Sequence, residues 1–470
     1  MEAFFESLQN IISAMGASVL LPIVIFILGL VLGAKPGRAF RAGVTVGIAF
    51  IGIGLVIGLM WTSLSNVSQA IVTKTGIQLD AVDVGWPTAA AIAFGSSIGT
   101  FIIPISIIVN LVLLWAGLTR TLNVDVWNFW HFAFVGALVF VVTNNLVLGL
   151  AAAAVACALA LFFADWTAKA IQQFYGIPGI SITTASAQSF VPFVIPINWL
   201  LDRIPGVRDW KADPESIQKR FGVFGEPIII GVVIGLVLGL IAYLPPGEGT
   251  TMTSAIISVL STAMNLGAVM LLLPRMVQIL MEGLIPLSES ARDFMAKRAA
   301  GKEIYIGLDA AILIGHPSAI ATGLLLVPIT ILLAIILPGN RMMPFADLAA
   351  IPFFVCMFAP LTRGNVVRMT ILGTLSAIVG LYMASWMAPI QTAAARLSNV
   401  GIPEGATLIT NMGDGWTASA FYLTFPATIG GAIVQWFWLL IFLVAIIVGF
   451  VFLNKNLERW SSLAGATRGD

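Results

Sequence analysis

Charged residues are scarce in this sequence. Asp, Glu, Lys and Arg together make up 10% of its 470 residues, whereas hydrophobic residues make up 59%. An ordinary soluble domain carries roughly 25% charged residues. A chain this apolar cannot cover its surface with polar groups, so we expect lipid to be its solvent. The composition therefore excludes a soluble enzyme, a nucleic-acid-binding protein and a disordered protein.

Cysteine and histidine are nearly absent as well. Cys157 and Cys356 both lie in apolar runs, which is typical of small buried side chains rather than of a disulfide or a metal pair. His131 and His316 have no third ligand at a suitable spacing for a metal. The chain also lacks a P-loop for ATP and an exposed phosphoryl carrier. We expect no catalytic residue, no metal and no cofactor.

Long hydrophobic runs are what the sequence has instead, and they predict an all-α polytopic membrane protein. A barrel would show short alternating segments, so continuous runs indicate helices. Eleven crossings are expected, at about 18–34, 43–64, 101–118, 129–147, 148–165, 226–245, 253–275, 319–337, 347–361, 369–388 and 429–453. Four further stretches are apolar but interrupted by Gly, Pro or Asp, and we expect them to be re-entrant: 83–99, 176–197, 305–318 and 401–427.

The distribution of basic residues predicts the orientation. Eleven crossings place the two termini on opposite sides of the membrane. With the N-terminus outside and the C-terminus in the cytoplasm, 20 of the 23 basic residues lie inside, and only Lys74, Arg341 and Arg396 lie outside. The first apolar run follows Glu2 and Glu6 rather than a basic segment, so we do not expect a cleaved signal.

The two halves of the chain share a series of marks that keep their order and nearly the same spacing. The pairs are Asp83 and Asp309, Arg120 and Arg341, Asp125 and Asp347, and Gly176-Ile177-Pro178 and Gly401-Ile402-Pro403, at offsets of 226, 221, 222 and 225 residues. Chance is the alternative, because apolar sequences align easily. We interpret the pattern as two five-crossing units that are inverted relative to each other.

The expected organisation is a first repeat over 1–200, a cytoplasmic linker over 201–225, a second repeat over 226–428, and a final helix and tail over 429–470. Inverted repeats with paired broken elements are typical of alternating-access transporters. A broken helix exposes backbone N–H and C=O groups at membrane depth, which is tolerable only where they line a cavity. Two facing breaks would form a binding site near the middle of the bilayer.

Three aspartates in apolar surroundings are candidate substrate ligands, because an ionisable group in a membrane costs about 2.5–3.5 kcal/mol or more. Asp83 opens one interrupted stretch and Asp309 lies within another. Asp414 lies in a Gly-rich break. Helix capping is the alternative role for Asp83 and Asp309, and a turn is the alternative for Asp414.

Neutral polar groups near these aspartates favour a hydroxyl-rich ligand. Ser186 and Gln188 belong to the polar stretch 181–189, which could also be an interfacial loop. His131, His316 and Trp86 complete the candidate set, and packing is the alternative role for each histidine. Carboxylates accept hydroxyl groups and tryptophan stacks on the C–H face of a sugar, so the set predicts a sugar or polyol site.

Several short motifs, in order along nearly the whole chain, carry a family resemblance. They are Ile51-Gly52-Ile53-Gly54, Val82-Asp83-Val84-Gly85-Trp86-Pro87, Asn123-Val124-Asp125-Val126-Trp127-Asn128, Phe224-Gly225-Glu226-Pro227, Gly307-Leu308-Asp309-Ala310, Gly315-His316 and Leu337-Pro338-Gly339-Asn340. With these motifs the sequence resembles the membrane-spanning IIC component of the bacterial galactitol phosphotransferase system. One departure is that galactitol members carry a histidine where this chain has Ser181 to Ser189, so the ligand could differ from galactitol.

The resemblance implies a permease of the bacterial inner membrane that works with separate IIA and IIB proteins. Phosphate would pass from phosphoenolpyruvate to a IIB cysteine, and the substrate would be phosphorylated as it arrives inside. The related ascorbate IIC transporters imply a homodimer whose core domain moves against a scaffold domain as an elevator. In that relative the ligand contacts match Asp309, the stretch near Ser186–Gln188 and the helix containing His131.

Two other function classes compete with this interpretation. A secondary transporter, driven by protons or by the substrate gradient alone, would need no IIB partner. An ion channel fits less well, because a continuous pore does not need paired re-entrant breaks. For the first interpretation, the linker 202–220 and the basic stretch 292–302 are candidate contacts for IIB, although the ordinary inside bias of basic residues would also explain them.

Overall fold

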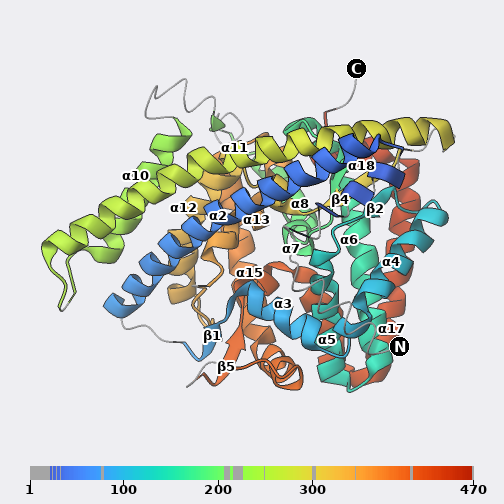
Figure 1. Ribbon diagram of the computed structural model, residues 1–470. Coiled ribbons are helices and arrows are strands. Elements are labelled where there is room, and N and C mark those ends of the chain that lie inside the picture. Colours follow the sequence, from blue (N-terminus) through green and yellow to red (C-terminus); the bar gives the residue numbers. More distant parts are fainter. Residues whose placement is uncertain are drawn as a thin grey trace.

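The computed structural model describes residues 33–75, 79–205, 212–214, 226–247, 249–298, 303–344, 346–402 and 406–467, together with parts of 19–31. Glu2, Glu6, Pro403, Lys302, part of the first expected crossing and most of the linker lie outside the described residues. The chain is predominantly helical (Figure 1).

The helices of the first half are α2 (Pro36–Thr75), α3 (Gly85–Gly95), α4 (Gly99–Trp115), α5 (Trp130–Thr143), α6 (Leu146–Tyr175), α7 (Ala185–Gln188) and α8 (Val191–Leu201). Those of the second half are α10 (Pro227–Tyr243), α11 (Met252–Arg298), α12 (Pro317–Ile336), α13 (Ile351–Val355), α14 (Phe358–Thr362), α15 (Val366–Leu397), α16 (Met412–Trp416), α17 (Ala418–Lys455) and α18 (Leu457–Leu463). Short 3-10 turns are η1 (Trp127–Phe129), η3 (Ala310–Ile312) and η4 (Leu348–Ala350).

Six helices of the described chain are long and apolar enough to cross a membrane: the apolar parts of α2 and α11, and α6, α12, α15 and α17. Helices α3 and α4 are a bent pair with an angle of 87° at their break, the geometry of a broken span or of a re-entrant loop. The bend follows from Ser96, whose extended backbone ends α3, and from Gly99, where an added Cβ would lie 2.4 Å from the carbonyl oxygens of Ala93 and Phe94. The protein is therefore a multi-pass membrane protein, as the composition predicts.

The segment 347–361 differs from the continuous crossing expected there. It consists of η4, α13 and α14, each at most five residues long. Pro352 and Pro360 lie in α13 and α14, and proline supplies no N–H for a helical hydrogen bond. The segment 347–361 therefore consists of short helices, whereas the corresponding segment of the first half contains the continuous helix α5.

The four interrupted stretches contain strands that the sequence analysis did not expect. They supply β1 (Ala81–Asp83), β3 (Ile180–Ile182), β4 (Tyr305–Leu308) and β5 (Leu408–Thr410), and β2 (Thr121–Asn123) precedes η1. In one sheet β1 pairs in parallel with β5, and Met342 bridges to Ala81. In the other sheet β4 lies between β2 and β3, parallel to both. Each sheet thus joins strands from both halves of the chain.

Matching hydrogen bonds fix the helices α6 and α15. Asn145 and Asn365 are their N-caps, and each side chain accepts from the backbone N–H three residues further on, at 3.1 and 3.0 Å. The N–H of Arg120 donates to Asp165 of α6 at 2.8 Å, and the N–H of Arg341 donates to Ser385 of α15 at 3.0 Å. These pairs are 220 or 221 residues apart, so the two helices hold their neighbouring loops in the same way.

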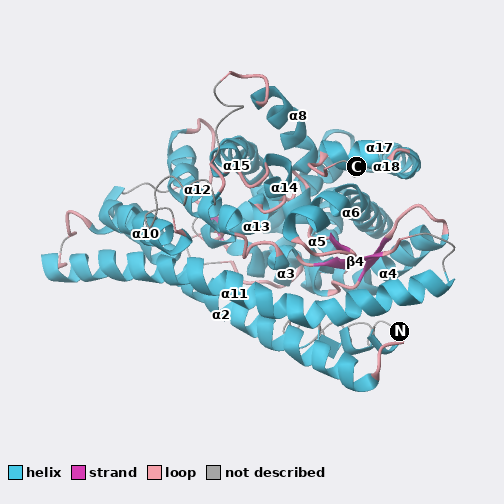
Figure 2. Cartoon of the chain, turned by 90° about the horizontal axis from the view of Figure 1, so that it is seen from above, coloured by secondary structure: helices cyan, strands magenta, loops and turns pink. Residues whose placement is uncertain are grey.

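Helices α2, α10 and α11 pack chiefly on one another. Figures 1 and 2 show α2 and α11 running side by side and diagonally along one side of the molecule. The 47 residues of α11 span roughly 70 Å at 1.5 Å per residue, which is more than twice the hydrocarbon thickness of about 30 Å. Such a helix must tilt or extend beyond the bilayer.

Candidate functional site

Asp309 follows β4, the central strand of the three-stranded sheet, and is the centre of the first acidic cluster. Its Oδ1 accepts the N–H of Ala311 at 2.9 Å, and its Oδ2 accepts the side-chain amide of Asn128 at 2.7 Å. The same amide donates to Asp125 at 2.6 Å. Asp125 and Asn128 are buried, whereas Asp309 is only partly buried. We call Asp125, Asn128 and Asp309 the amide-bridged cluster.

Threonine hydroxyls from the loop after β3 complete this cluster. The hydroxyl of Thr184 lies 3.4 Å from Oδ1 of Asp309 and accepts the N–H of Ala310 at 2.8 Å. The hydroxyl of Thr183 donates to Asn123 at 3.1 Å. The loop that follows β3 is therefore fastened to the ends of the other two strands of the sheet, β4 and β2.

Ser186 and Gln188 lie on α7, directly after this loop, and both are buried. The Gln188 amide donates to the carbonyl of Ile182, while its carbonyl oxygen has no hydrogen-bond partner. Gln188 therefore holds the end of β3 and keeps one acceptor unused.

A second acidic cluster follows β1 and is built mainly by backbone donors. Oδ1 of Asp83 accepts the N–H of Gly85 at 3.1 Å, and Oδ2 accepts the N–H groups of Ala346 and Asp347 at 2.8 and 3.3 Å. Asp347 in turn accepts the N–H of Trp86 at 2.9 Å and that of Gly413 at 2.8 Å. We call Asp83, Asp347 and Asn411 the backbone-held cluster.

The side-chain amide of Asn411 donates to Oδ2 of Asp347 at 3.3 Å. Gln391 donates to the other end of this amide at 3.1 Å. Asp414 lies three residues further on in α16 and is fully buried, and neither of its carboxylate oxygens has a hydrogen-bond partner in the described part of the chain. An acceptor buried in this way has its full binding capacity free.

Aromatic rings connect the surroundings of the two clusters. The Trp86 and Trp130 rings stack with centroids 6.4 Å apart, and Trp130 stacks on His131 at 3.8 Å. Nδ1 of His131 lies 3.1 Å from the carbonyl oxygen of Asn128. A carbonyl can only accept, so Nδ1 carries the proton and Nε2 is left as an acceptor. Helices α7 and α16 also contact each other, and the rings of Phe190 and Trp416 lie 5.1 Å apart nearby.

His316 has contacts of another kind. It is the N-cap of α12, where its Nδ1 accepts the N–H of Ser318 at 3.2 Å. Its ring packs against Phe174 at 4.8 Å and Tyr175 at 5.5 Å. These contacts give His316 a structural role and join it to neither acidic cluster.

The sequence singled out Asp83 and Asp309, together with the hydroxyl-rich stretch 181–189 that contains Thr184, but it assigned no binding role to Asp125, Asn128, Asp347 or Asn411. Asp125 and Asp347 were marks of the repeat, and Asp125 and Asn128 belonged to one of the family motifs. The signal for the amide-bridged cluster was the spacing of Asp125 and Asn128 on one turn, directly after a polar Asn123. The arrangement offers carboxylate, amide and hydroxyl groups side by side, which suits a ligand with several hydroxyl groups.

Comparison with known proteins agrees with this chemistry. A model of the family "PTS system sugar-specific permease component" matches residues 10–405. This chain belongs to that family. It is 41% identical over 381 residues to the "Putative permease IIC component" of Escherichia coli K12, covering 81% of this chain and 85% of that protein. It is 36% identical over 412 residues to the "PTS system galactitol-specific EIIC component" of the same strain, covering 87% and 88%.

The family assignment confirms the resemblance seen in the sequence motifs. The protein is a membrane-embedded sugar or polyol permease component of a phosphotransferase system, and components of this class work with IIA and IIB partners.

Proposed function

We propose that this IIC component binds galactitol or a related polyol or sugar, moves it across the membrane, and presents it to a IIB partner that phosphorylates it. The observation that carries the proposal is the amide-bridged cluster. Asp309 is partly buried; its Oδ1 accepts the Ala311 N–H at 2.9 Å and the Thr184 hydroxyl at 3.4 Å, and its Oδ2 accepts the Asn128 amide at 2.7 Å. A carboxylate has about four acceptor sites, so Asp309 can accept ligand hydroxyls without losing its place.

Seven further residues were expected to bind the substrate, and the structure supports this role more strongly for some than for others. They are Asp83, Trp86, His131, Ser186, Gln188, His316 and Asp414. Gln188 and Asp414 have unused acceptors, and His131 presents one ring nitrogen as an acceptor. Asp83 and His316 have structural roles as loop and helix caps. Galactitol as the substrate rests on the name of one relative, and the missing histidine in 181–189 makes a related polyol or sugar an equal candidate.

An alternating-access mechanism is proposed on the basis of the two inverted units. The two mixed sheets support this arrangement, because β1 and β4, at corresponding places in the two halves, each pair with strands of the opposite half. The matching caps Asn145 and Asn365 support it independently. In this proposal the interrupted stretches of the two units face each other across the substrate.

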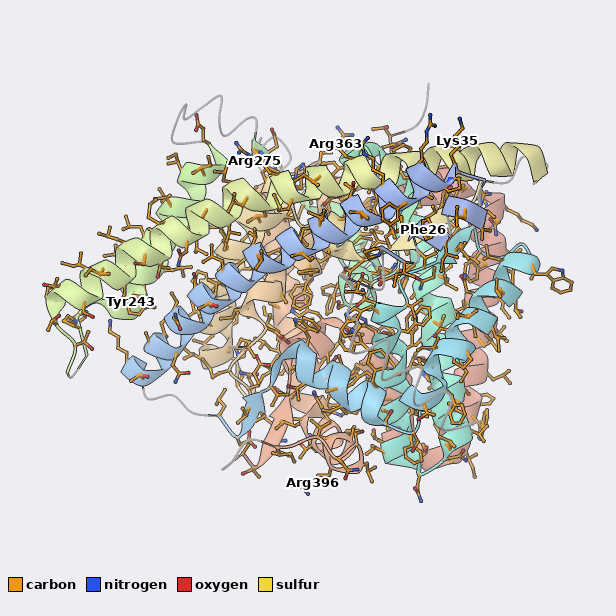
Figure 3. The ribbon with its side chains drawn as sticks, viewed as in Figure 1. Phe26, Lys35, Tyr243, Arg275, Arg363 and Arg396 are labelled. Carbon is orange, nitrogen blue, oxygen red and sulfur yellow. The ribbon has the colours of Figure 1, made fainter. Side chains whose placement is uncertain are left out.

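For the elevator motion we propose that α2, α10 and α11 belong to the scaffold domain, and that the helices around the two sheets form the core. The packing of these three long helices chiefly on one another supports the division. We propose a homodimer held by the scaffold. The cytoplasmic side is proposed to be that of Lys35, Arg275 and Arg363, which Figure 3 shows along one edge, with Arg396 at the opposite edge.

The stretches 202–220 and 292–302 remain the proposed contacts for IIB. Cysteine labelling at Lys35 and Arg459 tests the orientation, because both positions must react from the cytoplasm only.

The ligand role of Asp309 is tested by Asp309→Asn, which keeps the side-chain shape and removes the charge. We expect substrate uptake to fall by roughly a hundredfold, since a buried charged hydrogen bond contributes about 1.5–3 kcal/mol, while expression and thermal stability stay close to wild type. Asp80→Asn, at an exposed carboxylate, is the matched control and should transport normally. Wild-type uptake by Asp309→Asn would remove the ligand role.

Coupling to phosphorylation is tested in vesicles. Vesicles that contain the protein, IIB and a phosphoryl donor should accumulate phosphorylated substrate. Accumulation of free substrate without IIB would support the secondary-transporter alternative instead. A thermal-shift screen against hexitols, pentitols and aldoses would identify the ligand, because a molecule that binds the folded state raises its apparent stability.

A further inference from the structure

The C-terminal segment fills a groove beside α6. Nε1 of Trp166 donates to the carbonyl of Trp460 at 2.7 Å, and the two rings lie 5.2 Å apart. The ring of Phe162 also contacts Trp460, at 6.4 Å. Asn454 closes the same groove, since it accepts from Nε of Arg120 at 3.2 Å and donates to the carbonyl of Leu118 at 2.7 Å.

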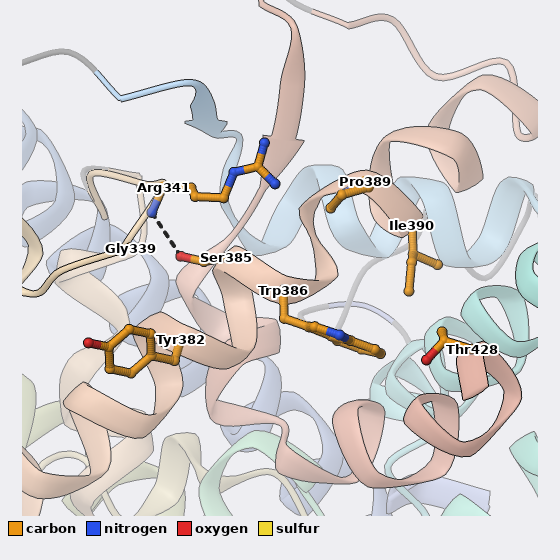
Figure 4. A pocket seen from close by; sticks show the side chains of 8 residues that line it. All are labelled: Gly339, Arg341, Tyr382, Ser385, Trp386, Pro389, Ile390 and Thr428. Atoms are coloured by element: carbon orange, nitrogen blue, oxygen red, sulfur yellow. Dashed lines mark hydrogen bonds between the residues drawn. The ribbon is translucent and has the colours of Figure 1, made fainter.

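The corresponding groove beside α15 is open. A cavity of about 460 Å³ is lined by Gly339, Arg341, Tyr382, Ser385, Trp386, Pro389, Ile390 and Thr428 (Figure 4). None of the eight expected substrate ligands is among these residues. Four of the lining residues correspond to residues that hold the C-terminal segment in the first half, at offsets of 220 or 221 positions. The pairs are Gly339 with Leu118, Arg341 with Arg120, Tyr382 with Phe162, and Trp386 with Trp166.

Two hydrogen-bond donors of the open groove are unused. Nε1 of Trp386 has no acceptor among the described residues, whereas its counterpart in Trp166 has the Trp460 carbonyl. Arg341 binds Asp80 through Nε and Nη2 and leaves Nη1 free of described partners. The protons of Tyr382, Ser385 and Thr428 are already donated, to Pro338, Asn340 and Phe425.

Exposed apolar side chains follow the end of the groove along the sequence. Thr428 lies at one end of the cavity and Arg341 at the other (Figure 4). Directly after Thr428, the side chains of Ile429 and Ile433 are 70% and 84% exposed. In a membrane protein, such apolar side chains face acyl chains, and an arginine with tryptophan and tyrosine is typical of the headgroup level.

We propose that this groove, which we call the α15 groove, binds one phospholipid of the outer leaflet. The phosphate and ester oxygens accept hydrogen bonds from Nη1 of Arg341 and Nε1 of Trp386, and an acyl chain passes Ile390 towards Ile429 and Ile433. The inference rests on the proposed repeat, but its readout is lipid binding and not uptake. A polyol fits less well, because it is best bound by carboxylate and amide side chains that offer strong acceptors beside donors, and neither a carboxylate nor an amide side chain is among the residues that line the α15 groove.

Native mass spectrometry of the full-length protein, titrated with phosphatidylglycerol, tests the proposal. Wild type should bind one lipid more tightly than all others. Arg341→Gln should raise the dissociation constant of that lipid about tenfold, which corresponds to about 1.4 kcal/mol. Trp386→Phe keeps the ring that packs on Phe421 at 4.9 Å and removes only the N–H group, so a smaller increase is expected.

Asp80→Asn is the matched control, because it breaks the same ion pair as Arg341→Gln but keeps the guanidinium. It should bind the lipid at least as tightly as wild type. Equal weakening by Asp80→Asn and Arg341→Gln would assign the effect to the ion pair and overturn the proposal. Unchanged binding by Arg341→Gln and Trp386→Phe, or displacement of the lipid by galactitol, would overturn it as well.

Discussion

The two acidic clusters lie after corresponding strands but satisfy their carboxylates differently. In the amide-bridged cluster the side chain of Asn128 connects Asp125 and Asp309. In the backbone-held cluster, Asp83 and Asp347 accept five backbone N–H groups between them. A backbone donor is fixed by the fold, whereas a side-chain amide can rotate towards a ligand. On this difference we base the proposal that the amide-bridged cluster serves binding and that the backbone-held cluster holds the loops together.

This difference also shows how two halves with the same plan can take separate tasks. In both halves an aspartate lies at the end of a parallel strand and accepts the N–H of the residue two positions further on: Asp83 accepts that of Gly85, and Asp309 accepts that of Ala311. The shared contact is a local cap. What differs is the second oxygen, which meets backbone in one half and an amide side chain in the other.

The largest expected effect breaks the backbone-held cluster. Asp347→Ala leaves the N–H groups of Trp86 and Gly413 and the amide of Asn411 without their acceptor in a buried place. Each unsatisfied donor costs about 1–3 kcal/mol, so we expect little folded protein, measured as yield and melting temperature in detergent. Asp125→Ala removes the acceptor of the Asn128 amide, which still has Asp309, and should be milder. A stable Asp347→Ala variant would contradict the structural role.

A pair of asparagine variants sharpens the comparison. Asn128→Ala should lower uptake about tenfold or more with little loss of stability, because it removes the bridge between Asp125 and Asp309. Asn411→Ala should lower the melting temperature instead, because Asn411 connects Gln391 to the buried Asp347. Uptake and melting temperature are measured for both variants. A loss of stability in Asn128→Ala together with a loss of uptake in Asn411→Ala would exchange the roles of the two clusters.

A smaller effect is expected at Thr184. Thr184→Val removes the acceptor of the Ala310 N–H at 2.8 Å and should cost about 1 kcal/mol. The variant should also weaken substrate binding modestly, since Ala310 directly follows Asp309. Thr184→Ser keeps the hydroxyl and should restore both properties, as measured by melting temperature and ligand titration. Equal loss in the serine variant would point to the methyl group rather than the hydroxyl.

The smallest effect concerns pH. The hydrogen bond from Arg341 holds the pKa of Asp80 below its ordinary value, so ionised Asp80 stabilises the folded state. This contribution is present above the unfolded pKa of about 3.9 and is lost as pH falls through the lower folded pKa. Because both side chains are exposed, the gain is small. The melting temperatures of wild type and Asp80→Asn should therefore converge below about pH 4, and a constant difference would contradict this linkage.

The sequence predicted the features that have a strong physical cost in lipid. Asp83 and Asp309 stood out because a carboxylate in an apolar run is expensive, and the breaks around them stood out through Gly and Pro. The long apolar helices followed from composition and run length. Asp309 lies at the amide-bridged cluster, and Asp83 lies at the other.

The strands and the partners of the aspartates were not predictable in the same way. A strand of three residues, such as Thr121–Asn123, is too short to show an alternating pattern. Asn128 carries no charge, so its cost in lipid did not distinguish it from a packing residue, whereas Thr184 was noticed only as one hydroxyl of the polar stretch 181–189. The pairing of β2 with β4, which brings Asn128 to Asp309, joins residues more than 180 positions apart and leaves no local signal.

The position of β4 between β2 and β3 has a consequence for biogenesis. Residues 121–182 leave the ribosome long before residue 305, so the first half must wait in the bilayer with the edges of two strands unpaired. The amide-bridged cluster can form only after the second half is inserted. The N-terminal half expressed alone should therefore be degraded, and the two halves expressed together as separate chains should rescue each other.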